Sequence, residues 1–215
     1  MSETTHTILV LLLLSNFGLF GSNRLLSLVS FVTLQGLLLS ALTLSAHYPL
    51  GGFRTIFLAV ALFVVEGILV PFVLRRAAAG APFLEDPPIV GYSLSLFSGA
   101  MIILLSFFFL SSVGYPTHGA SREFLPYAFA TMLSGLFLIV TRRSAMTQVI
   151  GYLVLSNGVF LAGSALAIEQ PLLLELGILL DAFLAVVILS AGMTHGTGVF
   201  QSVDTSNSAP IAREP

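Results

Sequence analysis

The chain divides into seven apolar runs, each about as long as a transmembrane helix. Since an α-helix rises 1.5 Å per residue, about 20 apolar residues cross the roughly 30 Å hydrocarbon core of a bilayer. The sequence therefore predicts an all-α integral membrane protein with about seven transmembrane helices. We expect these helices at residues 5–22, 25–46, 53–74, 89–113, 123–140, 146–168 and 171–193.

The overall composition agrees with this class and excludes several others. Of the 215 residues, 56% are hydrophobic and 8% are charged, whereas soluble domains carry about 25% charged residues. The sequence has no cysteine, which excludes disulfides, iron–sulfur clusters and cysteine-bound zinc in this chain. The net charge of −2 and the lack of a basic block argue against nucleic acid as a partner. Without a nucleophile elbow, a phosphate-binding loop or an HExxH motif, the sequence does not indicate catalysis by this chain alone.

The arginines predict how the helices are oriented in the membrane. Cytoplasmic loops of membrane proteins are enriched in basic residues, and all eight basic residues here are arginines. With the N-terminus outside, only Arg54 and Arg122 lie outside. The arginines on the cytoplasmic side are then Arg24, Arg75, Arg76, Arg142, Arg143 and Arg213. We therefore expect the N-terminus outside and the C-terminus inside. No basic residue precedes the first run, which argues against a cleaved signal peptide.

Three carboxylates lie inside the predicted spans. Asp181 falls at the middle of 171–193, and Glu175 precedes it by six residues. Six residues correspond to about 600° of helix rotation and about 9 Å of rise, so these two carboxylates cannot form a close pair. Glu66 lies near the middle of 53–74, just over one turn before Pro71.

Carboxylates at this depth are unfavourable unless they are paired, hydrated or protonated, so they indicate ion or proton handling. We predict Asp181, Glu175 and Glu66 as proton-relay groups. The alternative is that each is neutral and hydrogen-bonded, and only holds helices together.

Uncharged polar residues also occur within the spans, and Gln35, Ser156 and Asn157 could support a relay. Such amides and hydroxyls usually hold helices together, each contributing about 1 kcal/mol or less, and a place in a proton wire is the other interpretation.

The domain organisation is predicted to be simple. Residues 1–200 form a single transmembrane helical domain, and 201–215 form a polar tail. An arginine followed by a span with a central amide–glycine pair occurs twice, which suggests related halves at 5–76 and 123–195, with 89–113 as a spacer. Chance similarity between apolar segments is the alternative.

Several short motifs in the second half together resemble a known family. They are Arg142-Arg143, Gln148-Val149-Ile150-Gly151-Tyr152, Asn157-Gly158, Pro171 with Glu175-Leu176-Gly177, and Asp181. This run resembles the membrane component E of hydrogenase-4 and of related formate hydrogenlyase systems, and the resemblance extends more loosely over most of the chain. The second half is also similar to the small K subunit of bacterial NADH:quinone oxidoreductase, and Asp181 matches the buried acid of its last helix.

The resemblance implies a non-redox subunit of a hydrogenase-like or respiratory complex in the cytoplasmic membrane of a bacterium or archaeon. Its partners would be other membrane subunits, including antiporter-like subunits, and the lipid bilayer. A nickel–iron centre and iron–sulfur clusters would belong to partner subunits, and this chain would hold no cofactor. The sequence departs from the family pattern where Ser156 replaces a Glu and where Glu66 replaces an expected Lys.

Two other functions remain open at this point. The protein could be a structural scaffold that anchors larger subunits without moving ions, or a cation/proton antiporter subunit. A scaffold would tolerate neutral replacements of Glu66 and Asp181, whereas an independent transporter would move ions in liposomes that contain only this protein.

Overall fold

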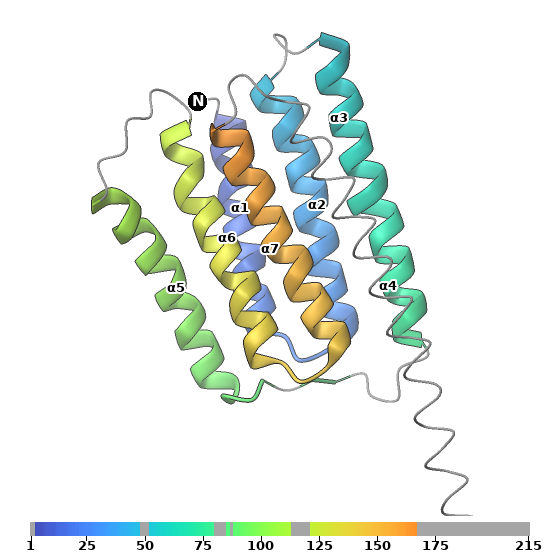
Figure 1. Cartoon of the computed structure of the whole chain (residues 1–215), viewed down its shortest axis with the longest axis vertical. Helices are drawn as coiled ribbons and strands as arrows, with labels where there is room; N and C mark the ends of the chain where they lie inside the picture. The colour runs from blue at the N-terminus through green and yellow to red at the C-terminus, as the bar shows by residue number, and fades with distance from the viewer. Residues whose placement is uncertain (1–2, 48–51, 80–84, 87, 113–120, 167–215) are drawn as a thin grey trace, which may run out of the picture.

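The computed structural model of the protein describes residues 3–47, 52–79, 85–86, 88–112 and 121–166, and these form a bundle of helices (Figure 1). The separate helices are α1 (Glu3–Phe20), α2 (Leu25–His47), α5 (Tyr92–Ser112), α6 (Ser121–Thr141) and α7 (Ala145–Leu166). Between α2 and α5, the segments α3 (Gly52–Val64), η1 (Val65–Leu69) and α4 (Val70–Ala79) follow one another without a break, and η1 is a turn of π-helix.

The prediction of an all-α membrane protein is confirmed for the described residues. The helices α1, α2, α5, α6 and α7 are long and apolar enough to cross a membrane. The continuous helix α3–η1–α4 covers the run predicted at 53–74. The last predicted span, 171–193, lies outside the described residues, so the count of seven and the orientation in the membrane stay predictions.

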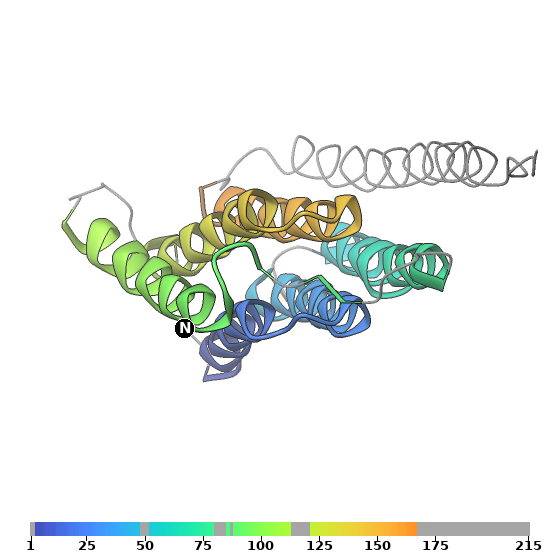
Figure 2. The same cartoon turned by 90° about the horizontal axis from the view of Figure 1, so that it is seen from below.

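Four helices form the centre of the bundle, and two helical units flank them. Seen along the helix axes, α6 and α7 lie over α1 and α2 (Figure 2). The outer helix α5 packs against α1 and α6, while α3–η1–α4 packs against α2. Buried leucines, valines and alanines fill the space between the helices in two clusters.

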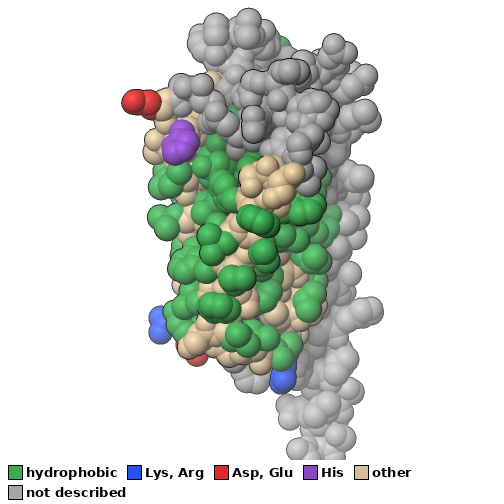
Figure 3. Space-filling view, turned by 90° about the vertical axis from the view of Figure 1, so that its left-hand side faces the viewer, with side chains coloured by type: hydrophobic (Ala, Val, Ile, Leu, Met, Phe, Trp, Pro, Cys, Tyr) green, Lys and Arg blue, Asp and Glu red, His purple; other side chains and the backbone are tan. Residues whose placement is uncertain are grey.

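The connections α1–α2 and α6–α7 and the described residues of the connection α4–α5 meet at one end of the bundle (lower end in Figure 1). We call it the arginine end, because it holds Arg24, Arg75, Arg76, Arg142 and Arg143. These five arginines are among the six that the sequence predicts on the cytoplasmic side; the sixth, Arg213, lies outside the described residues. Between the two ends, the face that includes α5 is covered mainly by hydrophobic side chains (Figure 3). Such a surface is suited to contact with lipid.

The closest helix pair is α6 and α7, whose backbones touch at glycines. A Cβ atom added at Gly135 would lie 2.4 Å from the backbone nitrogen of Leu155, and one at Gly158 would lie 2.5 Å from the backbone nitrogen of Met132. Small residues allow this approach, which is a usual way for membrane helices to gain packing energy. The α6–α7 pair is therefore a rigid wall against which α1 and α2 pack.

Candidate functional site

A row of hydrogen-bonded polar side chains crosses the apolar interior of the bundle. Gln35 Nε2 donates to Asn16 Oδ1 over 2.7 Å, and Asn16 Nδ2 donates to Thr131 Oγ1 over 2.8 Å. The Thr131 hydroxyl donates to the Tyr127 carbonyl oxygen over 2.8 Å. Asn157 extends the row on the other side, with its amide 3.3 Å from Gln35 Oε1. We call Asn16, Gln35, Thr131 and Asn157 the polar row.

The polar row is inaccessible to water and joins four different helices. Asn16, Gln35 and Thr131 are 0% exposed, and Asn157 is 2% exposed. They come from α1, α2, α6 and α7 respectively. A buried amide without a partner would cost about 1–3 kcal/mol, so each bond in the row helps to fix which helices are neighbours.

Glu66 of η1 lies at the Asn157 end of the polar row. When the Asn157 amide nitrogen is directed at the carboxylate, it lies 2.8 Å from Glu66 Oε2 and 3.2 Å from Oε1. The space for Glu66 exists because residue 36 is glycine: a Cβ atom there would lie 2.5 Å from Glu66 Cβ and 2.9 Å from Oε2. The carboxylate is thus held between α2 and α7 rather than directed at lipid.

The backbone around Glu66 is π-helical, and the local sequence explains why. The Val70 N–H donates to the Val65 carbonyl oxygen five residues earlier, which is the π-helical pattern. The next residue is Pro71, which has no N–H and cannot donate to the Gly67 carbonyl oxygen as a regular α-helix requires. Turns of π-helix occur frequently at functional sites. The extra residue in such a turn changes the direction in which the neighbouring side chains point.

The Asn157 amide can be satisfied in two orientations, and the charge on Glu66 decides between them. An ionised carboxylate only accepts hydrogen bonds, so it favours the orientation in which Asn157 Nδ2 donates to Glu66. A protonated Glu66 can donate to Asn157 Oδ1, which leaves Nδ2 free to donate to Gln35 Oε1. Both charge states of Glu66 therefore have a hydrogen-bonding partner in this site.

Three of the residues predicted from the sequence lie together: Glu66, Asn157 and Gln35. Ser156 is half-buried on α7, next to Asn157 in the chain. Asp181 and Glu175 lie outside the described residues, so their roles stay predictions. The sequence analysis missed Asn16 and Thr131. A polar residue in the middle of an apolar run was the available signal for Asn16.

A second polar cluster ties the connections together at the arginine end. Arg142 is 1% exposed, and its guanidinium donates to the carbonyl oxygens of Asp86 and of Ser22, the latter over 2.8 Å. The Asp86 carboxylate accepts from the Ser144 N–H over 3.2 Å. Burial lowers the pKa of Arg142, and the nearby Asp86 carboxylate opposes this effect. The side chain remains charged, because the pKa of arginine is very high.

The described residues offer no grouping of three or more His, Asp or Glu side chains that could hold a metal ion. The polar groups that the structure places in this site are the Glu66 carboxyl group, three amides and the Thr131 hydroxyl. The arrangement can bind and release a proton at Glu66, and it can stabilise the bundle.

Comparison with known proteins assigns the chain to a family. Over 165 residues it is 30% identical to "Uncharacterized protein Rv0085" of Mycobacterium tuberculosis, a match that covers 76% of this chain and 75% of that protein. The chain belongs to the same family as Rv0085. Over 141 residues it is 31% identical to hydrogenase-4 component E of Escherichia coli K12, and to that of Shigella flexneri, covering 63% of this chain. No family model and no solved structure matches the chain.

The protein is therefore a membrane protein distantly homologous to hydrogenase-4 component E. This confirms the resemblance at the level of the family. The match spans 65% of the length of the component E relatives. The similarity of the second half to the K subunit of NADH:quinone oxidoreductase stays a prediction.

Proposed function

We propose that the protein is a non-redox membrane subunit of a proton-translocating, hydrogenase-like complex in a prokaryotic cytoplasmic membrane. In this role it contacts antiporter-like subunits and contributes buried carboxylates to their proton path. Redox cofactors belong to partner subunits. The homology to hydrogenase-4 component E supports the kind of complex, and the site around Glu66 supports the kind of chemistry.

The observation that carries this proposal is the contact between Glu66 and Asn157. A relay group has to be stable both with and without its proton. Asn157 can donate to the ionised carboxylate and accept from the protonated one, so neither state leaves a buried polar group unpaired. A group whose only role was to hold helices together would need a partner in one state only.

The polar row responds to the proton but does not carry it. Amide side chains do not readily exchange protons along a row, whereas carboxylates and water do. When Asn157 turns toward an ionised Glu66, its oxygen faces Gln35, and Gln35 and then Asn16 can turn in the same sense. The Thr131 hydroxyl can rotate to complete the row. The charge on Glu66 is thereby linked to hydrogen bonds on the far side of the bundle.

We assign the next steps of the proton path to Asp181 and Glu175. Both lie in an apolar segment of membrane-spanning length that follows α7 in the chain. With Glu66, they provide protonatable groups at different depths, which successive transfers through water require. Residue Ser156 is proposed as a supporting polar group beside Asn157.

The first experiment is gentle purification of the protein from its native membranes, with mass spectrometry of the proteins that accompany it. A hydrogenase-like or NADH-oxidoreductase-like large subunit together with antiporter-like subunits is the expected result. Isolation of the protein alone, or only with cation-antiporter proteins, would overturn the assignment to this complex.

The second experiment separates a relay from a scaffold. Glu66→Gln and Asp181→Asn keep a donor and an acceptor but cannot ionise, so we expect an assembled complex with proton translocation largely lost in inverted membrane vesicles. Glu85→Gln makes the same change at an exposed carboxylate and should retain translocation. Full translocation in the Glu66 and Asp181 variants would support the scaffold function instead.

A further inference from the structure

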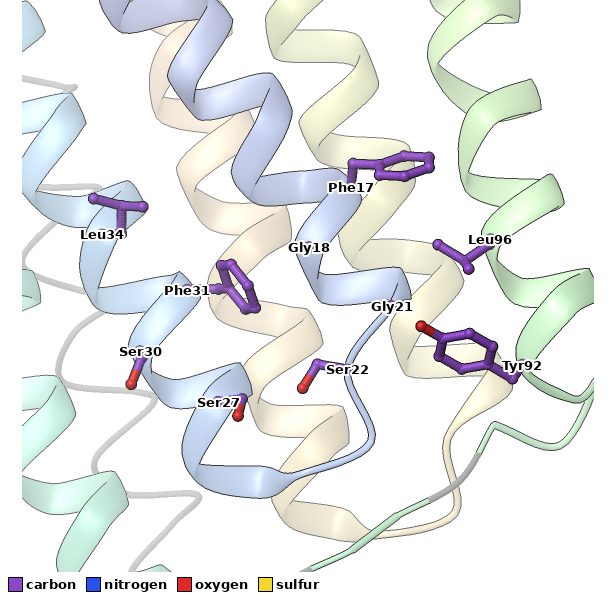
Figure 4. A pocket seen from close by; sticks show the side chains of 10 residues that line it. All are labelled: Phe17, Gly18, Gly21, Ser22, Ser27, Ser30, Phe31, Leu34, Tyr92 and Leu96. Carbon is purple, nitrogen blue, oxygen red and sulfur yellow. The ribbon is translucent and has the colours of Figure 1, made fainter.

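A groove of about 700 Å³ lies between α1, α2 and α5 near the arginine end (Figure 4). Its volume is within the range of about 300–1,000 Å³ that small-molecule sites occupy. The groove is open along its length, and two of its lining side chains, Phe17 and Leu34, are 39% and 42% exposed. It is separate from Glu66 and the polar row.

The lining of the groove changes from polar to apolar along the helices. The hydroxyl groups of Ser22, Ser27 and Tyr92 line it near the arginine end. Among the described residues, none of these three hydroxyls takes part in a hydrogen bond. Farther from the arginine end, the lining is aromatic and aliphatic, with Phe31 and Leu34 on α2. A ligand that fits this gradient has a hydrogen-bonding head and an apolar tail.

Along α2, the groove extends over about two thirds of the hydrocarbon thickness of one leaflet. Leu34 lies seven residues after Ser27, the first residue of α2 in the lining, which corresponds to a rise of about 10 Å. Half of a bilayer's hydrocarbon core is about 15 Å thick. An acyl chain that begins at the hydroxyl groups would therefore follow the groove for most of the depth of one leaflet.

The charge near the polar end favours an anion. Arg24 immediately precedes α2, and its side chain is 78% exposed. Both α2 and α5 begin at this end, so the positive ends of their dipoles lie near the groove mouth. Glu85, whose carboxylate oxygen lies 3.7 Å from Arg24 Nε, is the acidic group that a ligand's phosphate would compete with.

We propose that this groove binds one phospholipid with an anionic headgroup from the leaflet at the arginine end. The phosphate lies beside Arg24 and accepts hydrogen bonds from the hydroxyls of Ser22, Ser27 and Tyr92. One acyl chain follows the apolar lining past Phe31 to Leu34. The lipid thereby fills the space between α1, α2 and α5 that protein side chains leave open.

The absence of tryptophan from the sequence allows a direct test. Phe17→Trp places a single fluorophore in the groove, and Phe97→Trp places one on α5 outside it, where Phe97 is 63% exposed. Each full-length variant is reconstituted in phosphatidylcholine vesicles with rising fractions of phosphatidylglycerol brominated in its acyl chains. We expect half-quenching of the groove reporter at a several-fold lower fraction than the outside reporter needs. With brominated phosphatidylcholine, both reporters should respond alike.

Two charge variants in the Phe17→Trp background test the headgroup contact. Arg24→Gln should remove the preference for phosphatidylglycerol, while Arg76→Gln, at the same end but on α4, should retain it. Equal quenching of the two reporters by phosphatidylglycerol would overturn the proposal. Equal effects of both charge changes would also overturn it, because they would indicate only a general surface potential.

A variant that blocks the groove tests its shape. A Cβ atom at Gly21 would lie 3.6 Å from Leu96 and 3.7 Å from the Tyr92 hydroxyl oxygen, so it fits without a clash and points across the groove. Gly21→Leu should fill the space and abolish preferential quenching, with an unchanged circular dichroism spectrum. Preferential quenching that persists in this folded variant would show that the lipid binds elsewhere.

Discussion

Replacing Arg142 by Gln should destabilise the protein strongly, whereas the same change at Arg143 should not. Arg142 is buried and donates to the carbonyl oxygens of Asp86 and Ser22, while Arg143 is exposed. A hydrogen bond from a charged group contributes about 1.5–3 kcal/mol. Since the shorter Gln side chain cannot reach both carbonyl oxygens, Arg142→Gln should lower the free energy of unfolding by at least about 1.5–3 kcal/mol, the contribution of one such hydrogen bond.

The assay is equilibrium unfolding of the full-length protein in mixed micelles by sodium dodecyl sulfate, followed by circular dichroism. The Arg143→Gln variant serves as the matched control, because it removes the same charge at the next position. Its free energy of unfolding should stay within about 0.5 kcal/mol of the unchanged protein. Equal losses in the two variants would refute the reasoning, since both arginines would then act only through surface charge.

Three glycine variants, one of them a control, test the packing of the bundle and of the site. Gly135→Ala puts a methyl group 2.4 Å from the Leu155 nitrogen, and overpacking of this kind costs about 1–3 kcal/mol, whereas Gly21→Ala meets nothing closer than 3.6 Å. Detergent unfolding should distinguish them, and equal stabilities would contradict the close packing of α6 and α7. Gly36→Ala puts a methyl group 2.5 Å from Glu66 Cβ, so we expect slower proton translocation by the assembled complex. Translocation at the normal rate in vesicles would count against the placement of Glu66.

The two amide–glycine pairs of the repeated sequence pattern lie close to the candidate site in the structure. The sequence pairs Gln35-Gly36 with Asn157-Gly158 as corresponding positions of two halves. In the structure, the two amides belong to the same polar row, and Gly36 borders Glu66. Whether the halves are related stays a prediction, because the helix that would pair with α3–η1–α4 lies outside the described residues.

The sequence by itself determined the class of the protein and the positions of its described helices. A bilayer requires about 20 apolar residues per helix, and polar breaks between such runs mark the ends. The clustering of arginines at one end was also predictable, because basic residues at span ends follow a general rule. The prediction of Glu66 as a relay group, with Gln35 and Asn157 as supporting polar residues, followed from the unfavourable free energy of polar groups in hydrocarbon.

Only the tertiary structure decided which polar groups meet. Membrane helices such as α1, α2 and α7 are apolar on nearly all sides, so their periodicity does not reveal which face turns inward. Asn16 and Thr131 therefore gave no sign in the sequence that they would be partners. Arg142 and Arg143 look equivalent in the sequence, and only the fold buries one and exposes the other. Their difference arises from helix ends and connections that become neighbours when the bundle packs.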